Sequence, residues 1–247
     1  MRKYKKTVIV TGASRGIGRT TAALFALKGY NVLINYNNSE YEAMKLYRHL
    51  KQNGLSVGVY KADVSKREQV DAMVDYCVDQ FGRADILINN AGISQQKLFT
   101  DISELEWEDM LNVNLKGVFN CSQSVLRYML HEKKGKIINI SSIWGMVGAS
   151  CEAHYSASKA GVIGLTKALA KELGPSNIQV NSIAPGINKT DMMSSFTEAE
   201  INDLKEAIPL MKLGRPKDIA ACALFLASEN ADFITGQVIS PNGGFVI

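Results

Sequence analysis

The chain is expected to form an α/β fold, a single-domain Rossmann-type doubly wound parallel sheet with helices on both faces. Apolar, β-branched runs alternate with longer amphipathic stretches, and a glycine-rich turn follows the first run. Such alternation gives right-handed crossovers and a parallel sheet. Nearly continuous apolar strands suit a sheet that is covered on both faces. The 247 residues contain no linker, low-complexity tract or repeat, so we expect one domain over residues 1–247.

The elements follow from these patterns. The expected strands are Thr7–Thr11, Val32–Tyr36, Ser56–Tyr60, Asp85–Asn89, Lys136–Ser141, Ile178–Ala184 and Gln237–Ser240. The expected helices are Ile17–Lys28, Tyr41–Gln52, Lys66–Phe81, Glu104–His131, Ala153–Leu173 and Pro216–Ser228.

A long irregular segment, residues 187–214, follows the strand that ends before Pro185-Gly186. We expect a lid here, because ligands of such sheets bind beyond the carboxyl ends of the strands. The alternative is a surface helical hairpin whose apolar residues pack down. These residues are Met192, Met193, Phe196, Leu204 and Ile208.

Composition argues against several classes of protein. The net charge is +4 and the basic residues are scattered, so we expect no nucleic-acid partner. No apolar run is long enough for a membrane span, and no signal peptide is expected. The four cysteines and three histidines show no metal-ligand spacing, so we expect no metal and a reducing cytoplasm. His154 is expected to be structural, because adjacent helical residues point apart.

The turn after the first strand predicts a site for the diphosphate of a dinucleotide. Glycines permit a tight turn and close approach of the diphosphate, and the next helix supplies N–H groups and a favourable dipole. The alternative is a turn needed only for packing. The expected cofactor contacts in this loop are Gly12, Ser14, Arg15, Gly16, Ile17 and Gly18.

The end of the second strand favours NADP(H) over NAD(H). An acidic residue there would hold the ribose 2′-hydroxyl of NAD, but the strand ends in Asn35-Tyr36-Asn37-Asn38. Arg15 is placed to pair with a 2′-phosphate, although it is also compatible with a solvated loop charge. We include Asn37 among the expected cofactor contacts.

Tyr155 and Lys159 form the candidate catalytic pair, because a spacing of four puts them on one helix face. A nearby ammonium favours the phenolate, so we expect the tyrosine pKa to fall. Such a tyrosine can exchange a proton with an alkoxide. Ser142, after the strand that ends at Ser141, is placed to hydrogen-bond a substrate carbonyl. The alternative is that Ser142 caps a helix or turn, and Ser141 is an equally plausible cap.

Together these motifs resemble the short-chain dehydrogenase/reductase family over essentially the whole chain. The matching residues are Thr11–Gly18, Asp63-Val64, Asn89-Asn90-Ala91-Gly92, Asn114, Ser142, Tyr155, Lys159, Pro185-Gly186 and Thr190. The resemblance implies that Tyr155 is the general acid/base, that Lys159 holds the nicotinamide ribose and that Ser142 orients the carbonyl. Asn114 would support a water that relays protons to Lys159.

The resemblance also implies further cofactor contacts. Asp63 and Val64 would contact the adenine, and Asn90, Ala91 and Gly92 would line the cofactor floor. The nicotinamide end would be held by Pro185, Gly186, Asn188 and Thr190, where Asn188 replaces the family's usual aliphatic residue. Ser240–Gly244 departs from the usual pattern too, and we expect this to affect a structural turn.

Within the family the chain is most similar to enzymes that reduce a 3-oxoacyl thioester on acyl carrier protein in fatty acid synthesis. A basic rim of Lys133, Lys134 and Lys136 would help such an acidic partner to approach. A second hypothesis is a reductase of a ketone-bearing lysine modification on elongation factor P, with Trp144 and Glu152 flanking a cationic side chain. Others are a sterol or sugar dehydrogenase and a nonenzymatic NADP(H) sensor. The resemblance implies a homotetramer.

Overall fold

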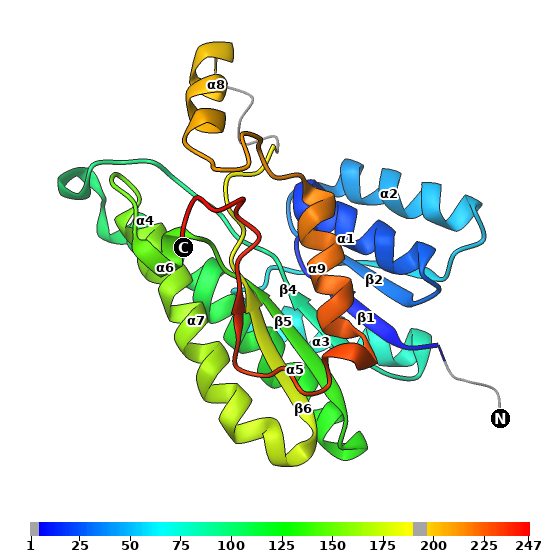
Figure 1. Ribbon diagram of the computed structural model, residues 1–247. Helices are drawn as coiled ribbons and strands as arrows, with labels where there is room; N and C mark the ends of the chain where they lie inside the picture. The colour runs from blue at the N-terminus through cyan, green and yellow to red at the C-terminus, as the bar shows by residue number, and fades with distance from the viewer. Residues whose placement is uncertain (1–4, 190–196) are drawn as a thin grey trace.

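The computed structural model describes residues 5–189 and 197–247 (Figure 1). Its centre is a parallel sheet with strand order β3-β2-β1-β4-β5-β6-β7. The strands are β1 (Thr7–Val10), β2 (Asn31–Tyr36), β3 (Val57–Lys61), β4 (Ile86–Asn89), β5 (Gly135–Ile140), β6 (Ile178–Ile183) and β7 (Val238–Ile239). The expected α/β class and doubly wound topology are confirmed.

Helices cover both faces of the sheet. The α-helices are α1 (Gly16–Leu27), α2 (Glu40–Gln52), α3 (Arg67–Phe81), α4 (Glu104–Leu111), α5 (Gly117–Glu132), α6 (Trp144–Val147), α7 (Ala153–Leu173), α8 (Glu198–Glu206) and α9 (Pro216–Ala227). Short helical turns are η1 (Phe99–Asp101), η2 (Asn112–Lys116), η3 (Gly174–Ser176) and η5 (Glu229–Ala231). Most boundaries differ from the expected ones by one or two residues, as is usual where helices and strands fray.

Alternate residues of each central strand enter different hydrophobic cores. In β1, Val8 and Val10 join the core under α1, α2 and α9, whereas Ile9 joins the core under α3, α5 and α7. Both cores hold fully buried side chains, so the strands are apolar on both faces, as a sheet between two helical layers requires.

The expected helix over Glu104–His131 needs a correction. It is divided into α4 and α5 by η2, a π-helical turn centred on Asn114. The Asn114 side chain bonds to Ile93 and Ser158, on a distant loop and helix, and π turns often occur where a helix adjusts to a functional residue.

The expected basic rim is also wrong in one member. Lys136 is buried, donates to the Ser228 carbonyl at 2.8 Å and pairs with Asp232 at 2.7 Å. Lys133 and Lys134 are exposed, but they precede β5 and so lie at the opposite end of this strand from Ser142. The three lysines therefore do not form one basic surface beside the site.

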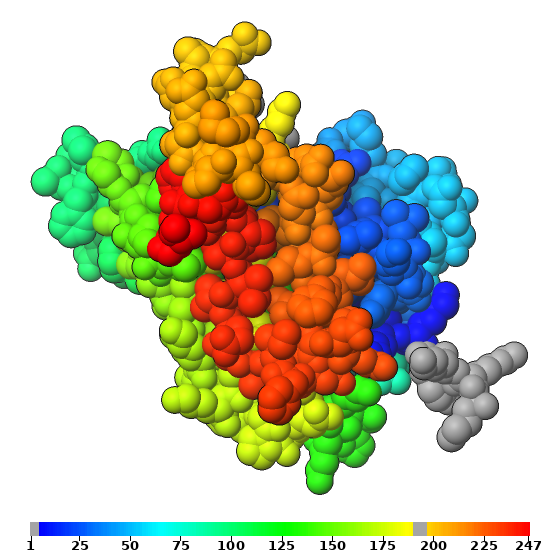
Figure 2. All heavy atoms as spheres, in the orientation of Figure 1, coloured from blue at the N-terminus to red at the C-terminus, as the bar shows by residue number. Residues whose placement is uncertain are grey.

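The segment after β6 is joined at its two ends. Asn188 and Gly214 form a parallel bridge, Lys189 N–H donates to the Gly214 carbonyl, and Gly214 N–H donates to the Ile187 carbonyl. Between these ends, α8 stands out from the body, with the C-terminal residues beside its base (Figure 2). Of the residues expected in the lid, Met192, Met193 and Phe196 lie outside the described residues, and lid closure stays a prediction.

None of the helices in the two described ranges is both long and apolar enough to cross a bilayer.

Candidate active site

The predicted functional residues gather at the carboxyl ends of β1, β4, β5 and β6. The strand order reverses between β1 and β4, which is the place where doubly wound sheets bind their ligands. The loop after β1 and the loop after β4 therefore meet at this edge, and the first turn of α7 lies beside the end of β5.

The glycine loop has the backbone conformation that its sequence predicts. Gly12 and Gly16 have φ values of +60° and +54°, in the left-handed region that favours glycine. Gly18 has a steric role instead, because a Cβ there would lie 2.4 Å from both the Asn90 Nδ2 atom and the Gly12 carbonyl oxygen. The third glycine is therefore needed for close packing between the two loops.

Thr11 and Asn90 join the loops after β1 and β4. Asn90 Nδ2 donates to the carbonyl oxygens of Thr11 at 2.9 Å and Gly12 at 3.0 Å. The Thr11 hydroxyl accepts from the N–H groups of Asn90 at 2.9 Å and Ala91 at 3.0 Å. Sequence reasoning assigned Asn90 and Ala91 to the cofactor floor, but it did not single out Thr11, whose role depends on a strand 79 residues away.

Asn35 is a second residue that sequence reasoning did not assign to the site. It is buried at the end of β2, and its side-chain oxygen accepts from the Gly12 N–H at 3.1 Å. Its amide nitrogen donates to the Ala62 carbonyl at 3.0 Å. The signal was an asparagine inside an otherwise apolar strand, because a buried amide must find partners.

The residues at this end of the site fit a dinucleotide. Arg15 is the N-cap residue of α1 and makes no side-chain capping bond, and the first helical turn carries no acid that would repel a phosphate. The Arg15 side chain is exposed and makes no ion pair within the described residues. Asn37 is exposed directly after β2, so no carboxylate occupies the place expected for a 2′-hydroxyl acceptor.

Asp63 and Val64 follow β3 and have local partners. The Asp63 carboxylate accepts from the N–H of Ser65 at 2.9 Å and from its hydroxyl at 2.8 Å. Val64 is buried against Gly117, where a Cβ would lie 2.6 Å from the Val64 Cγ2 atom. The turn is thus fixed by Asp63 itself, and an adenine contact by either residue stays a prediction.

Ser142, Tyr155 and Lys159 are brought together, as predicted. The Lys159 ammonium lies 5.7 Å from the Tyr155 ring centroid and donates to the Ile140 carbonyl at 2.9 Å. The Ser142 hydroxyl lies near enough to the Tyr155 phenol to lower the pKa of that phenol, and it accepts from the Trp144 N–H at 3.2 Å. Ser141 donates to the Lys159 carbonyl at 2.9 Å. Of the two serines, Ser142 therefore contacts the tyrosine, whereas Ser141 anchors α7.

The expected fall in the Tyr155 pKa is not found. Burial raises the pKa of Tyr155 to about 12, and its hydrogen bond with Ser142 only partly opposes this. Burial lowers the pKa of Lys159 to about 8. The sequence indicated the spacing of the two groups but not their removal from water, which is the larger effect on both.

Asn114 connects the loop after β4 to the catalytic helix. Its Oδ1 atom accepts from the Ile93 N–H at 2.8 Å, and its Nδ2 atom donates to the Ile93 carbonyl at 2.9 Å and the Ser158 hydroxyl at 3.0 Å. A Cβ at Gly92 would lie 3.2 Å from Asn114 Oδ1 and 3.4 Å from Lys159 Nζ. Asn114, Gly92 and Lys159 are thus neighbours, while the proton-relaying water stays a prediction.

The loop after β6 completes this edge. The Pro185 carbonyl accepts from the Ile143 N–H at 3.1 Å, and a Cβ at Gly186 would lie 2.6 Å from the Asn242 Cα atom. Asn188 Nδ2 donates to the Gly186 carbonyl at 2.7 Å. The amide of Asn188 therefore closes a tight local turn that an aliphatic residue could not make. Thr190 lies outside the described residues.

The C-terminal turn depends on two polar side chains that depart from the family pattern. Ser240 donates to the Ala184 carbonyl at 2.8 Å, and Asn242 donates to Ser240 at 2.8 Å and to the Val246 carbonyl at 2.7 Å. These bonds attach the chain terminus to the end of β6, in agreement with the structural role expected for this turn.

This arrangement supports acid–base chemistry at an oxygen atom. The hydroxyl groups of Ser142 and Tyr155 lie close together at the end of β5, and the Lys159 ammonium lies beside the Tyr155 ring. Among the described residues, no three His, Cys, Asp or Glu side chains come together as a metal-binding group. Ser142, Tyr155 and Lys159 together suit proton transfer to or from a bound carbonyl or alcohol.

Comparison with known proteins agrees with this geometry. The family model of the short chain dehydrogenases matches residues 6–201. A 3-oxoacyl-acyl-carrier-protein reductase, FabG, of Staphylococcus epidermidis is 45% identical, over 97% of this chain and 98% of the relative. FabG of Chlamydia trachomatis is 44% identical over 97% of this chain and 96% of its own, and FabG of Thermotoga maritima is 41% identical over the full length of both.

The buried ammonium predicts an unusual pH dependence of stability. With a pKa of about 8 in the folded chain against 10.5 for an ordinary lysine, the unfolded state binds more protons between these values. Stability from this group therefore rises with pH across that window, by on the order of 3 kcal/mol. Lys159→Met should remove the rise. We would measure urea unfolding of both proteins from pH 7.5 to 11, with exposed Lys28→Met as the control. A constant difference between Lys159→Met and wild type would contradict the prediction.

Proposed function

The chain belongs to the short-chain dehydrogenase family, and on that premise we propose that it reduces a 3-oxoacyl thioester on acyl carrier protein to the 3-hydroxyacyl form, with NADPH, in fatty acid synthesis. The observation that carries the proposal is the convergence of Ser142, Tyr155 and Lys159 beside the glycine loop. Relatives that bear this activity in their names are 41–45% identical over nearly the whole chain, which supports the substrate class.

The Tyr155 phenol can serve as the proton donor in reduction. With a pKa of about 12, the Tyr155 phenol carries its proton at neutral pH and is ready to donate it. When bound, NADPH would supply a hydride for the carbonyl carbon. Tyr155 gives its proton to the carbonyl oxygen, Ser142 donates a hydrogen bond to the same oxygen, and the Lys159 ammonium stabilises the phenolate that remains.

We assign the cofactor as NADPH from the end that carries the 2′-phosphate. Arg15 is exposed at the start of α1, with its charge available, and Asn37 stands where an acid would select NAD. A guanidinium recognises a phosphate by paired, charge-assisted hydrogen bonds, whereas a carboxylate would repel it. Gly12, Ser14, Gly16, Ile17 and Gly18 would hold the diphosphate.

One surface feature favours a second candidate, a ketone that carries a cation, such as a modified lysine of elongation factor P. Glu152 lies close enough to Tyr155 for its charge to raise the tyrosine pKa. Its only side-chain partner within the described residues is Gln96, at 3.3 Å. Trp144 meets the C-terminal Phe245 edge to face, with centroids 5.9 Å apart. A carboxylate near the catalytic tyrosine suits a substrate that carries a cation.

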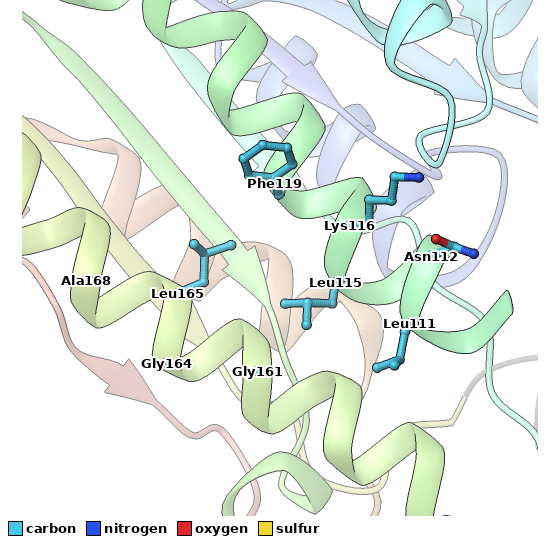
Figure 3. A pocket seen from close by; sticks show the side chains of 9 residues that line it. All are labelled: Leu111, Asn112, Leu115, Lys116, Phe119, Gly161, Gly164, Leu165 and Ala168. Atoms are coloured by element: carbon cyan, nitrogen blue, oxygen red, sulfur yellow. The ribbon is translucent and has the colours of Figure 1, made fainter. Parts of the chain in front are cut away.

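We further propose a homotetramer built on paired helices. Leu111, Leu115 and Phe119 line an open apolar pocket opposite Gly161, Gly164, Leu165 and Ala168 of α7 (Figure 3). This pocket is formed by residues of α4, η2, α5 and α7, and 45% of Phe119 is exposed. Small residues on α7 would let a helix from a second copy approach closely, and a second copy of the same apolar face is its complement.

We also propose that the enzyme is cytoplasmic, since a reducing compartment keeps cysteines as thiols. All four cysteines remain thiols, and burial raises the pKa of both Cys77 and Cys121 to about 12, so these two stay protonated and unreactive.

The substrate assignment is tested by NADPH oxidation with acetoacetyl thioester, a cationic aminoketone, a neutral ketone and a steroid ketone. We expect the thioester to be turned over most efficiently, and Tyr155→Phe to lose on the order of 10²–10⁴-fold of that rate. Tyr41→Phe, an exposed change on α2, is the control. Preference for the aminoketone, lost in Glu152→Gln, would select the second candidate. NADPH binding without turnover of any carbonyl would indicate a sensor.

The cofactor assignment predicts a selective defect in Arg15→Gln. Loss of charge-assisted bonds to the 2′-phosphate should weaken NADPH binding about 10-fold or more, while NADH binding changes little. Fluorescence titration with both cofactors measures this, with exposed Lys28→Gln as the matched control. Equal weakening of both cofactors, or tighter binding of NADH by the wild type, would exclude the assigned role.

The tetramer predicts a sedimenting mass near four times the chain mass of 27.0 kDa. Leu165→Glu should dissociate it, because the interface would then bury a charge without a partner. Leu27→Glu, at an exposed site on α1, should leave the mass unchanged. A wild type that stays monomeric at micromolar concentration would rule the proposal out.

A further inference from the structure

The loop that follows β4 is attached to the segment leading into α7 by three successive residues. The Gln95 Oε1 atom lies 3.1 Å from the His154 Nε2 atom. The Gln96 amide donates to Glu152 at 3.3 Å, and the Lys97 N–H donates to the Cys151 carbonyl at 2.7 Å. Asn114 fixes the beginning of this loop, at Ile93, and the catalytic Tyr155 comes directly after His154. These bonds therefore fix the position of the loop relative to the start of α7.

Glu106, on α4, supports the loop from the other side. Its carboxylate accepts from Gln95 Nε2 at 2.8 Å and from the Lys97 ammonium at 2.7 and 2.8 Å. The same carboxylate closes the capping box of α4 with Ser103. These contacts lower the pKa of Glu106 well below its usual range, so it is ionised and can only accept hydrogen bonds.

This network selects one form of His154. Because Gln95 Nε2 donates to the Glu106 carboxylate, its Oε1 atom is the one that faces the histidine, and the His154 Nε2 atom must donate. The imidazole is fully buried, and its Nδ1 atom has no hydrogen-bond partner among the described residues. If the Nδ1 atom carried a hydrogen, it would be a buried donor without an acceptor, so the ring hydrogen belongs on Nε2.

We propose that His154 is a positioning residue for carbonyl reduction: through Gln95 it holds the loop of residues 93–97 as a fixed wall of the substrate site beside Tyr155. The inference deepens the proposed function and rests on it. The loop begins next to the catalytic lysine, since a Cβ at Gly92 would lie 3.4 Å from Lys159 Nζ, and 44% of Ile93 is exposed. His154 touches no reacting atom, and it acts by placing the wall on which the substrate rests.

The test is a double-mutant cycle on substrate KM. His154→Leu and Gln95→Leu should each raise KM for the preferred keto substrate about tenfold, since either leaves a polar partner without its bond. The double variant should be no worse than Gln95→Leu, which also loses the bond to Glu106. His154→Gln, whose amide nitrogen can occupy the place of Nε2, should stay within about threefold of the wild type. Exposed His131→Gln is the matched control.

The split between kinetic constants separates positioning from general structural damage. We expect kcat and the affinity for NADPH to stay near wild type in all four variants. Additive losses in the cycle, equal damage by His154→Gln and His154→Leu, or a parallel loss of NADPH affinity would overturn the proposal. If His154→Leu does not fold, the comparison of Gln95→Leu with the wild type and His154→Gln still decides.

A second readout does not depend on turnover. Long-range ¹H–¹⁵N correlation spectra distinguish the two neutral imidazole tautomers, and His154 is one of only three histidines in the chain. We expect a single Nε2–H form for His154 that becomes mixed in Gln95→Leu. A mixed tautomer in the wild type would overturn the inference. A wild type with the expected tautomer that reduces no carbonyl would overturn the proposed function instead.

Discussion

The buried ammonium of Lys159 is the interaction on which the rest of the site depends. Only 4% of this residue is exposed, and removing an ammonium from water is costly unless it is paired or hydrogen-bonded. The last carbonyl of β5, at Ile140, accepts from it and so ties the charge to the sheet. Ser141 anchors the backbone of the same residue. The charge therefore stays where a phenolate forms, because the strand end and the helix hold it from both sides.

Close packing of α6 on α7 helps to bury Lys159. At Gly145, on α6, a Cβ would lie 2.7 Å from the Lys159 carbonyl carbon, so only glycine lets α6 pack onto α7 at this point. Asn114 closes the other side through the π-helical turn, which turns its amide towards Ile93 and Ser158. Catalytic groups thus sit on rigid elements whose packing leaves little freedom to the side chains, as preorganised acid–base sites require.

Most of the fold and the Tyr155–Lys159 pair could be predicted from local patterns in the sequence, whereas Asn114 and the choice of Ser142 over Ser141 came from the family resemblance. Apolar alternation predicts the sheet, and a spacing of four residues predicts the Tyr155–Lys159 pair. The break in the expected helix was missed, since the partners of Asn114 lie 21 and 44 residues away. The direction of the Tyr155 pKa shift was wrong for a related reason. The spacing of two residues indicates that a charge is near. The burial of Tyr155 is set by elements distant in sequence, and burial has the larger effect on its pKa.

The bridge between Asn188 and Gly214 pairs the two ends of the segment that follows β6. Because the two ends are paired, a change of length between them need not displace the sheet, although Ile208 is buried against the C-terminal turn and the Leu210 N–H donates to the Gly243 carbonyl at 3.1 Å. Doubling the length of a flexible loop costs only about 0.6 kcal/mol of closure entropy. A chain with this anchor can therefore change the part of the segment before Ile208 while Ser142, Tyr155, Lys159 and the glycine loop keep their places.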